Sequence, residues 1–198
     1  MSKKLRFQEP IKIAPNIIGW LDENYAPIII DERTNEHLDP TNLDHKIIIY
    51  EQQVREWFLN PAAALIPIEN RGFIVLMICL SYLEGVEQYR RGESSKNKSK
   101  EFFISALKKM YPNEFSDGEL KTLYDEARNG LFHNGMVKGK IIINYEFEES
   151  IRFQGTMDIR INPRKLFEDI ENDFTNLLAE LKVEGVIRNQ FDQMYSNI

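Results

Sequence analysis

The chain is poor in cysteine, in long apolar runs and in positive charge. Its one cysteine is Cys79, so neither an internal disulfide nor a zinc site built from several thiolates can form. Cys79 lies inside an apolar run, where a buried and unreactive thiol is expected rather than a nucleophile. Such sparse use of cysteine is typical of a protein from a reducing compartment.

No apolar run is long enough for a membrane-spanning helix. The run Phe73–Leu80 is too short to cross a bilayer. Met1–Arg6 is basic, but no apolar segment of signal-peptide length follows it. We therefore expect a cytoplasmic protein without membrane contact.

Positive charge is outnumbered by negative charge. The 198 residues include 25 lysines and arginines against 31 aspartates and glutamates, a formal net charge of −6. This balance argues against nonspecific coating of nucleic acid, although a local basic patch can still hold a short stretch of backbone. With 42% hydrophobic and 28% charged residues, the composition is that of a globular chain, and the length favours one domain with extensions.

What the chain does contain is mainly helical periodicity. Asn60-Pro61 is expected to end the first helix, and the second is apolar all round through Leu80, as if it lay inside a bundle. Ser116 and Glu119 form a capping-box pattern before the fourth helix. Helices are predicted at 47–59, 68–91, 99–110, from Ser116 into the 126–135 segment, at 163–181 and at 186–195.

Two segments depart from the helical pattern. Residues 1–45 contain prolines spaced so that no long helix fits, which predicts an irregular extension with a short strand at 26–30. Residues on either side of Glu148-Glu149-Ser150 alternate and are β-branched or aromatic, which predicts a β-hairpin at about 138–161. The expected fold is mainly α, with the extension 1–45, a helical domain at 46–184 that includes the hairpin, and a helix or tail at 185–198.

The fourth helix ends in residues with the chemistry of a catalytic site, namely Arg128, Asn129 and His133. Arg128 and His133 are five residues apart, which leaves ~140° between them on an ideal helix. A straight helix would not aim both side chains at one small ligand. Either Gly130 or the approach to Gly135 bends the helix end, or two copies of the segment share the work across a dimer axis. The sequence leaves both arrangements open.

This segment resembles the Arg-polar-x-x-x-His motif of the HEPN family, with Asn129 as the polar residue. HEPN domains are small helical bundles with the motif near the end of a late helix, and the resemblance covers about two-thirds of the chain. It implies a metal-independent, cofactor-free endoribonuclease that works as a homodimer in toxin, phage-defence or stress systems. An antitoxin or regulatory protein is a further implied partner. The hairpin and residues 1–45 depart from the family pattern.

The motif residues suit this chemistry. His133 can act as base or acid because the reference pKa of imidazole is ~6.5. Arg128 offers a planar fork of donors that matches a phosphate, and Asn129 can donate to a phosphate oxygen or fix the histidine tautomer. Attack by the ribose 2′-hydroxyl would leave a 2′,3′-cyclic phosphate and a 5′-hydroxyl.

Other residues are weaker candidates, and each has a structural alternative. Arg128 can pair with Asp125 or Glu126, and a protonated His133 can stabilise the last helical turn through the helix dipole.

The main alternative function is a non-catalytic HEPN-like module that binds nucleotides, RNA or protein, followed by a purely structural helical protein. The further substrate-binding candidates are Asn134, Arg90, Arg91 and Lys96, and the candidates for orienting Arg128 or His133 are Glu84 and Glu87.

Overall fold

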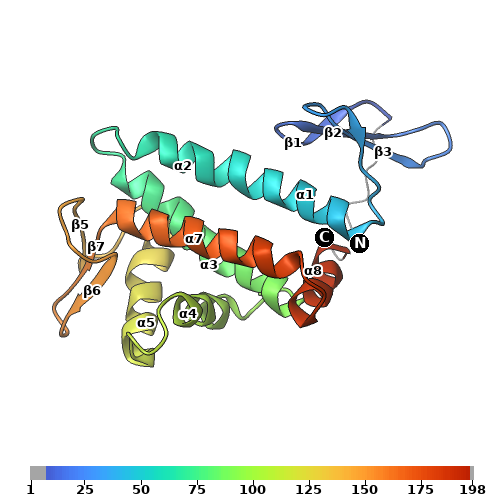
Figure 1. Ribbon diagram of the computed structural model, residues 1–198. Coiled ribbons are helices and arrows are strands. Elements are labelled where there is room, and N and C mark those ends of the chain that lie inside the picture. Colours follow the sequence, from blue (N-terminus) through green and yellow to red (C-terminus); the bar gives the residue numbers. More distant parts are fainter. Residues whose placement is uncertain (1–7, 197–198) are drawn as a thin grey trace.

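The computed structural model describes residues 8–196. Residues 1–7, the start of the expected extension, and residues 197–198, the end of the expected tail, lie outside the described residues. Helices form the body of the molecule, and two small sheets lie at its opposite ends (Figure 1). The mainly α fold with added β-structure is therefore confirmed.

The first helix continues beyond its expected end. α1 (Leu43–Val54) runs through a π-helical turn, η1 (Arg55–Leu59), into α2 (Asn60–Leu65). The prediction that Asn60-Pro61 ends the helix is therefore wrong. In a regular helix a proline ring clashes with the carbonyl four residues earlier, whereas here the Asn60 N–H bonds the Arg55 carbonyl and widens the turn just before Pro61.

The remaining helices follow the sequence periodicity closely. α3 begins at Gly72 rather than at residue 68, because Asn70 adopts a left-handed conformation with φ +62° before it. The predicted capping box of Ser116 and Glu119 is present. These helices are α3 (Gly72–Arg91), α4 (Ser99–Met110), α5 (Asp117–Leu123), α7 (Pro163–Leu181) and α8 (Val186–Ser196).

The N-terminal region is a regular sheet, so the expectation of an irregular extension is wrong. Its antiparallel strands follow the order β1-β2-β3-β4. The prolines that exclude a helix do not exclude strands, and Pro27 stands at the first position of β3, where a proline is tolerated. The strands are β1 (Ile11–Ala14), β2 (Ile17–Leu21), β3 (Pro27–Asp31) and β4 (Glu36–His37).

The second sheet contains the expected hairpin with different strand pairing. β6 (Ile151–Gln154) and β7 (Asp158–Ile161) form the antiparallel hairpin, and β5 (Ile141–Ile143) pairs in parallel with β7. The predicted pairing across residues 148–150 is therefore wrong. The Asn162 side chain donates to the carbonyls of Tyr145 and Phe147 at 2.8 Å each, which holds the segment after β5 as a loop.

α3 is the central element of the core, in contact with α2, α4, α7 and α8. Cys79 is fully buried there, as expected, and burial raises the pKa of its thiol far above the ordinary value. The expectation that α3 is enclosed all round is wrong, because Phe73, Ile74 and Met77 are about 40% exposed. Within residues 8–196, none of the helices has both the length and the apolar character needed to cross a membrane.

Candidate functional site

The motif lies on a helix that changes its winding just before it. α5 continues into a π-helical turn, η2 (Tyr124–Arg128), and then into α6 (Asn129–Asn134). Gly135 ends α6 in a left-handed conformation with φ +71°. The irregular turn thus ends at Arg128, the first residue of the motif, instead of lying at Gly130.

Gly130 has a packing role. A Cβ at this position would lie 2.7 Å from the Met136 carbonyl oxygen, so only glycine lets the chain after α6 return so closely. The Lys138 N–H then bonds the Glu126 carbonyl at 2.9 Å. The helix end that carries His133 is therefore fixed against the turn that carries Arg128.

Arg128 is held by α3. Its Nη2 donates to Glu84 Oε2 at 2.7 Å, and the two side chains are only 18% and 15% exposed. The guanidinium carbon lies 4.7 Å from the centre of the Phe132 ring and 5.5 Å from that of Tyr124. The alternative ion pair with Asp125 or Glu126 is not formed, and Glu84 takes the orienting place for which the sequence made it a candidate.

Glu84 is ionised in this position. Burial alone would raise its pKa, but hydrogen bonds from Ser95 and Ser99 and the charge of Arg128 hold the pKa below its ordinary value. The Ser95 hydroxyl donates to Oε1 at 2.7 Å. The carboxylate is thus satisfied from both sides and can fix one edge of the guanidinium.

Asn129 belongs to a second small cluster beside Arg128. Its Nδ2 donates to Asp125 Oδ1 at 3.3 Å, and the same carboxylate accepts from Lys100 Nζ at 2.7 Å. Lys100 also lies 5.4 Å from the centre of the Tyr124 ring. In this structure Asn129 therefore connects the motif to α4 and does not orient His133.

His133 stands exposed on the last turn of α6. Among the described residues it has no hydrogen-bond or ion-pair partner. Asn134 is exposed beside it. Within one chain, Arg128 is thus bonded to Glu84 and His133 is exposed, and no hydrogen bond joins the two side chains.

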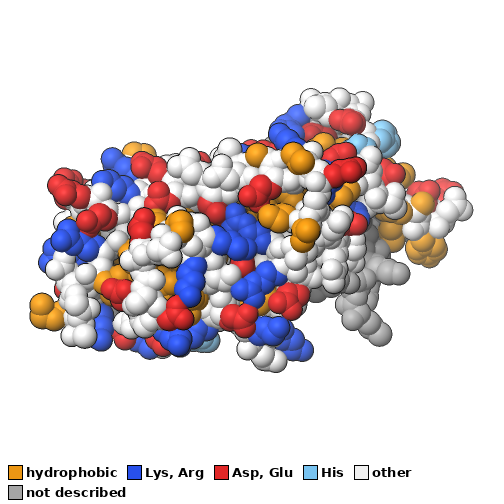
Figure 2. Space-filling view, turned by 60° about the horizontal axis from the view of Figure 1, so that its bottom comes forward, with side chains coloured by type: hydrophobic (Ala, Val, Ile, Leu, Met, Phe, Trp, Pro, Cys, Tyr) orange, Lys and Arg blue, Asp and Glu red, His pale blue; other side chains and the backbone are white. Residues whose placement is uncertain are grey.

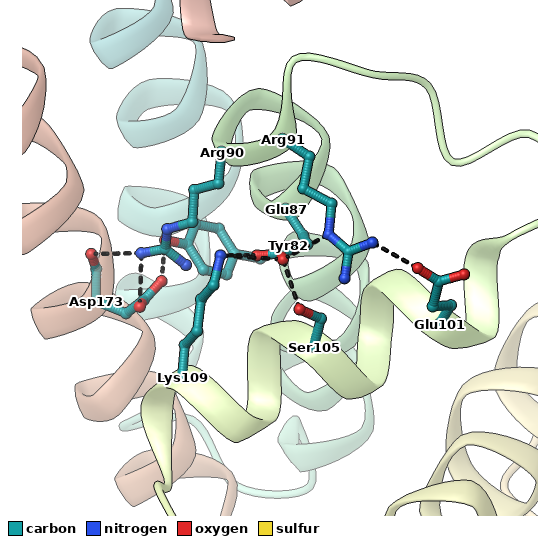
Figure 3. A network of polar contacts seen from close by, with 8 residues as sticks. All are labelled: Tyr82, Glu87, Arg90, Arg91, Glu101, Ser105, Lys109 and Asp173. Atoms are coloured by element: carbon teal, nitrogen blue, oxygen red, sulfur yellow. Dashed lines mark hydrogen bonds and ion pairs between the residues drawn. The ribbon is translucent and has the colours of Figure 1, made fainter. Parts of the chain in front are cut away.

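The two arginines expected to bind substrate form ion pairs at the end of α3 (Figure 3). Arg90 is 7% exposed and its Nη2 donates to Asp173 Oδ1 at 2.8 Å, while the Tyr82 hydroxyl donates to the other oxygen at 2.7 Å. Arg91 bonds Glu87 at 2.9 Å and Glu101 at 2.6 Å. Arg90 is therefore unavailable to a substrate, because the last turn of α3 packs against α7.

Glu87 is turned toward α4 and away from the motif. It is fully buried and accepts hydrogen bonds from Ser105 at 2.6 Å, Lys109 at 2.9 Å and Arg91 at 2.9 Å (Figure 3). Burial would raise its pKa, but these donors hold the pKa below its ordinary value. Its place does not fit the predicted role of orienting Arg128 or His133.

A hollow lined by several cations, here called the basic hollow, lies beside α4, and Arg91 is the one of these cations that the sequence analysis named as a binding candidate. It measures about 590 Å³ and lies between α4, α5 and the loop before α4. Lys and Arg side chains alternate with Asp and Glu on this face of the molecule (Figure 2). Three of its cations lie within residues 91–100, and the packing of α4 beside α5 adds Lys108 and Lys121 to them. Two carboxylates, Glu101 and Asp117, also line the hollow, and all its cations except Lys121 form ion pairs. The cations that line the hollow are Arg91, Lys98, Lys100, Lys108 and Lys121.

No metal site accompanies these groups within residues 8–196, where no three His, Cys, Asp or Glu side chains are arranged to hold an ion. Lys96 is exposed and forms no ion pair with a described residue. What the motif offers is a guanidinium fixed at one edge, an imidazole open to solvent and a neighbouring basic hollow. Comparison with family models, with curated proteins and with solved structures finds no match.

Proposed function

We propose that the protein is a metal-independent endoribonuclease of the HEPN type, with Arg128 and His133 as its catalytic residues. The observation that carries this proposal is the state of Arg128. Glu84 and two aromatic rings fix the guanidinium, yet its other donors have no protein partner among the described residues. A fixed arginine with free donors at the surface suits a phosphate better than it suits a purely structural role.

The proposed reaction needs no metal ion. His133 takes the proton from the ribose 2′-hydroxyl or gives one to the leaving 5′-oxygen, while Arg128 stabilises the charge that grows on the phosphorane. Asn129 lies beside Arg128, where it can donate to the same phosphate. The products are a 2′,3′-cyclic phosphate and a 5′-hydroxyl, and the lysines of the basic hollow bind the RNA backbone next to the motif.

The active form is proposed to be a homodimer, because within one chain no hydrogen bond joins Arg128 to His133. Two copies related by a two-fold axis can pool one side chain from each. A cytoplasmic role in toxin, phage-defence or stress systems, with an antitoxin or regulatory protein as partner, follows from the resemblance to the HEPN family. The competing candidate is a non-catalytic module that binds RNA, nucleotides or protein, favoured by the absence of any group that orients His133.

The decisive experiment compares His133→Ala with His37→Ala, a variant of another exposed histidine. Cleavage of single-stranded RNA in the presence of EDTA should fall by about 10²- to 10⁴-fold in the first variant, the usual cost of losing a general acid or base. RNA binding should persist, and His37→Ala should cleave normally. Wild-type protein that binds RNA without ever producing cyclic-phosphate ends would establish the binding module instead.

A further inference from the structure

One face of the central helix α3 is apolar and uncovered by the described chain. Phe73, Ile74 and Met77 are 39%, 42% and 38% exposed, and the neighbouring turn η1 presents Trp57 and Phe58 at 45% and 46% exposure. Soluble monomers seldom expose large apolar side chains in one continuous patch, and such patches mark interaction sites. This face is separate from the basic hollow.

The exposed face of α3 contains a stripe whose side chains change in size along the helix. Ile74, Ile78, Ser81 and Gly85 recur at spacings of four, three and four, the spacing with which helices pair in coiled coils. The first two side chains are large, and the last two are small or absent. Between residues 73 and 85 the one charged side chain is Glu84, which Arg128 neutralises.

The small half of the stripe opens into a groove of about 370 Å³ between α1, η1 and α3. A Cβ at Gly85 would meet no atom within 4 Å, although glycine in a helix interior costs about 0.5–1 kcal/mol relative to alanine. Neither the backbone conformation nor packing within the chain requires this glycine. The residues that line the groove near it include Tyr50, Trp57, Phe58, Ser81 and Tyr89.

We propose that a second copy of this chain packs antiparallel on this face, with Ile74 of each copy entering the groove beside Gly85 of the other. A two-fold axis midway between residues 74 and 85 also places Ile78 opposite Ser81, so each large side chain meets a small one. The same patch serves both copies, as a two-fold interface requires. The stripe is thus complementary to itself, which selects a second copy as the occupant.

The exposed apolar area fits such an interface. The exposed fractions of Trp57, Phe58, Phe73, Ile74 and Met77 amount to roughly 400 Å² if aromatic and large aliphatic side chains offer about 200 Å² each. A stable interface buries about 800 Å² per partner, with the greater part of its centre apolar. The face therefore supplies the apolar centre of an ordinary dimer.

This inference deepens the homodimer of the proposed function by naming the surface on which it forms. The two-fold axis is perpendicular to the paired helices, so both Glu84–Arg128 pairs lie on the same side of the interface. Cleavage is not needed for the packing itself. A dimer on this face without ribonuclease activity would overturn the proposed function alone, and an active dimer that forms on another surface would overturn this inference alone.

The first test is to fill the groove. In sedimentation or light scattering at tens of micromolar, wild-type protein should be a dimer and Gly85→Leu a monomer, with a melting temperature that is not lowered. Ala179→Leu, which adds the same side chain on an exposed turn of α7, should remain a dimer. Ile74→Gln removes the inserted side chain and should also give a monomer. A monomeric wild type, or a dimeric Gly85→Leu and Ile74→Gln, would overturn the proposal.

The second test reports which surfaces meet. Ser81→Cys places a thiol close to the proposed axis, and a short bis-maleimide should link two copies in high yield. Cys79 cannot compete, because it is fully buried and its thiol has a raised pKa. Ala179→Cys serves as the matched control and should give only the yield of random collisions. Equal yields for the two variants would mean that α3 does not form the interface.

Discussion

Two glutamates of α3, one turn apart, face different environments. Glu87 is fully buried and three cationic or hydroxyl donors satisfy it. Glu84 lies near the surface and holds a single arginine whose remaining donors are free. A carboxylate enclosed by its partners stabilises the fold, whereas one that fixes an arginine with free donors prepares a site. The difference separates the structural network from the proposed active site.

The largest effect should come from breaking the buried network. Asp173→Ala leaves Arg90 charged and buried without its carboxylate, and also removes the acceptor of the Tyr82 hydroxyl. We expect a loss of about 3–5 kcal/mol in the free energy of unfolding, as for other buried pairs that lose one partner. Chemical denaturation measures it. A loss of unfolding free energy smaller than that expected for a surface ion pair would show that the network contributes little to stability.

A substitution of Arg128, the partner of Glu84, should change function more than stability. Arg128→Lys keeps the charge but loses the planar fork, so RNA cleavage should fall about 10²-fold, as when one donor to a developing oxyanion is removed. The melting temperature should change little. Parallel cleavage and thermal unfolding assays check this prediction, and Arg164→Lys, at an exposed position on α7, is the control. A drop of several degrees without loss of cleavage would assign Arg128 to the fold.

A smaller effect is expected for Glu84→Gln. The amide oxygen can still accept from Arg128, but the guanidinium loses its counter-charge and becomes less firmly placed. The free energy of unfolding should fall by about 1 kcal/mol, because a hydrogen bond between charged groups contributes about that much more than a hydrogen bond with a neutral partner. Cleavage should fall by less than in Arg128→Lys. Comparing kcat with KM distinguishes positioning of Arg128 from substrate binding, since loss of a positioning residue should lower kcat. Unchanged kinetics would remove Glu84 from the site.

The smallest effect concerns pH. The pKa of Glu87 is lowered in the folded protein relative to its ordinary value of 4.5, so its contribution to stability is present above pH 4.5 and is lost as the pH falls through the folded pKa. Denaturation series from pH 6 to acid should therefore show a steeper loss for wild type than for Glu87→Gln. Identical slopes would indicate that Glu87 is not ionised in the core.

The helices could be predicted because their signals are local. Apolar spacing, the capping box at Ser116 and Gly92 beyond the end of α3 act within a turn or two of the chain. The Arg128–His133 motif could be recognised for the same reason. The prediction from Pro61 was wrong because a proline ends a helix only if the helix is regularly wound. A single π-helical turn before it changes the backbone hydrogen bond that the proline would have blocked.

The sequence by itself determined the mainly helical fold, the positions of most helix ends and the presence of a guanidinium and an imidazole on one helix end. Tertiary structure decided which of these groups are available. Contacts between residues 44 positions apart tie Arg128 to Glu84, and others 83 positions apart bury Arg90 against Asp173. Such pairings depend on how helices pack and not on spacing within any one of them. The open groove beside Gly85 is visible only once α1 and α3 lie together, because a cavity is a property of the space between elements.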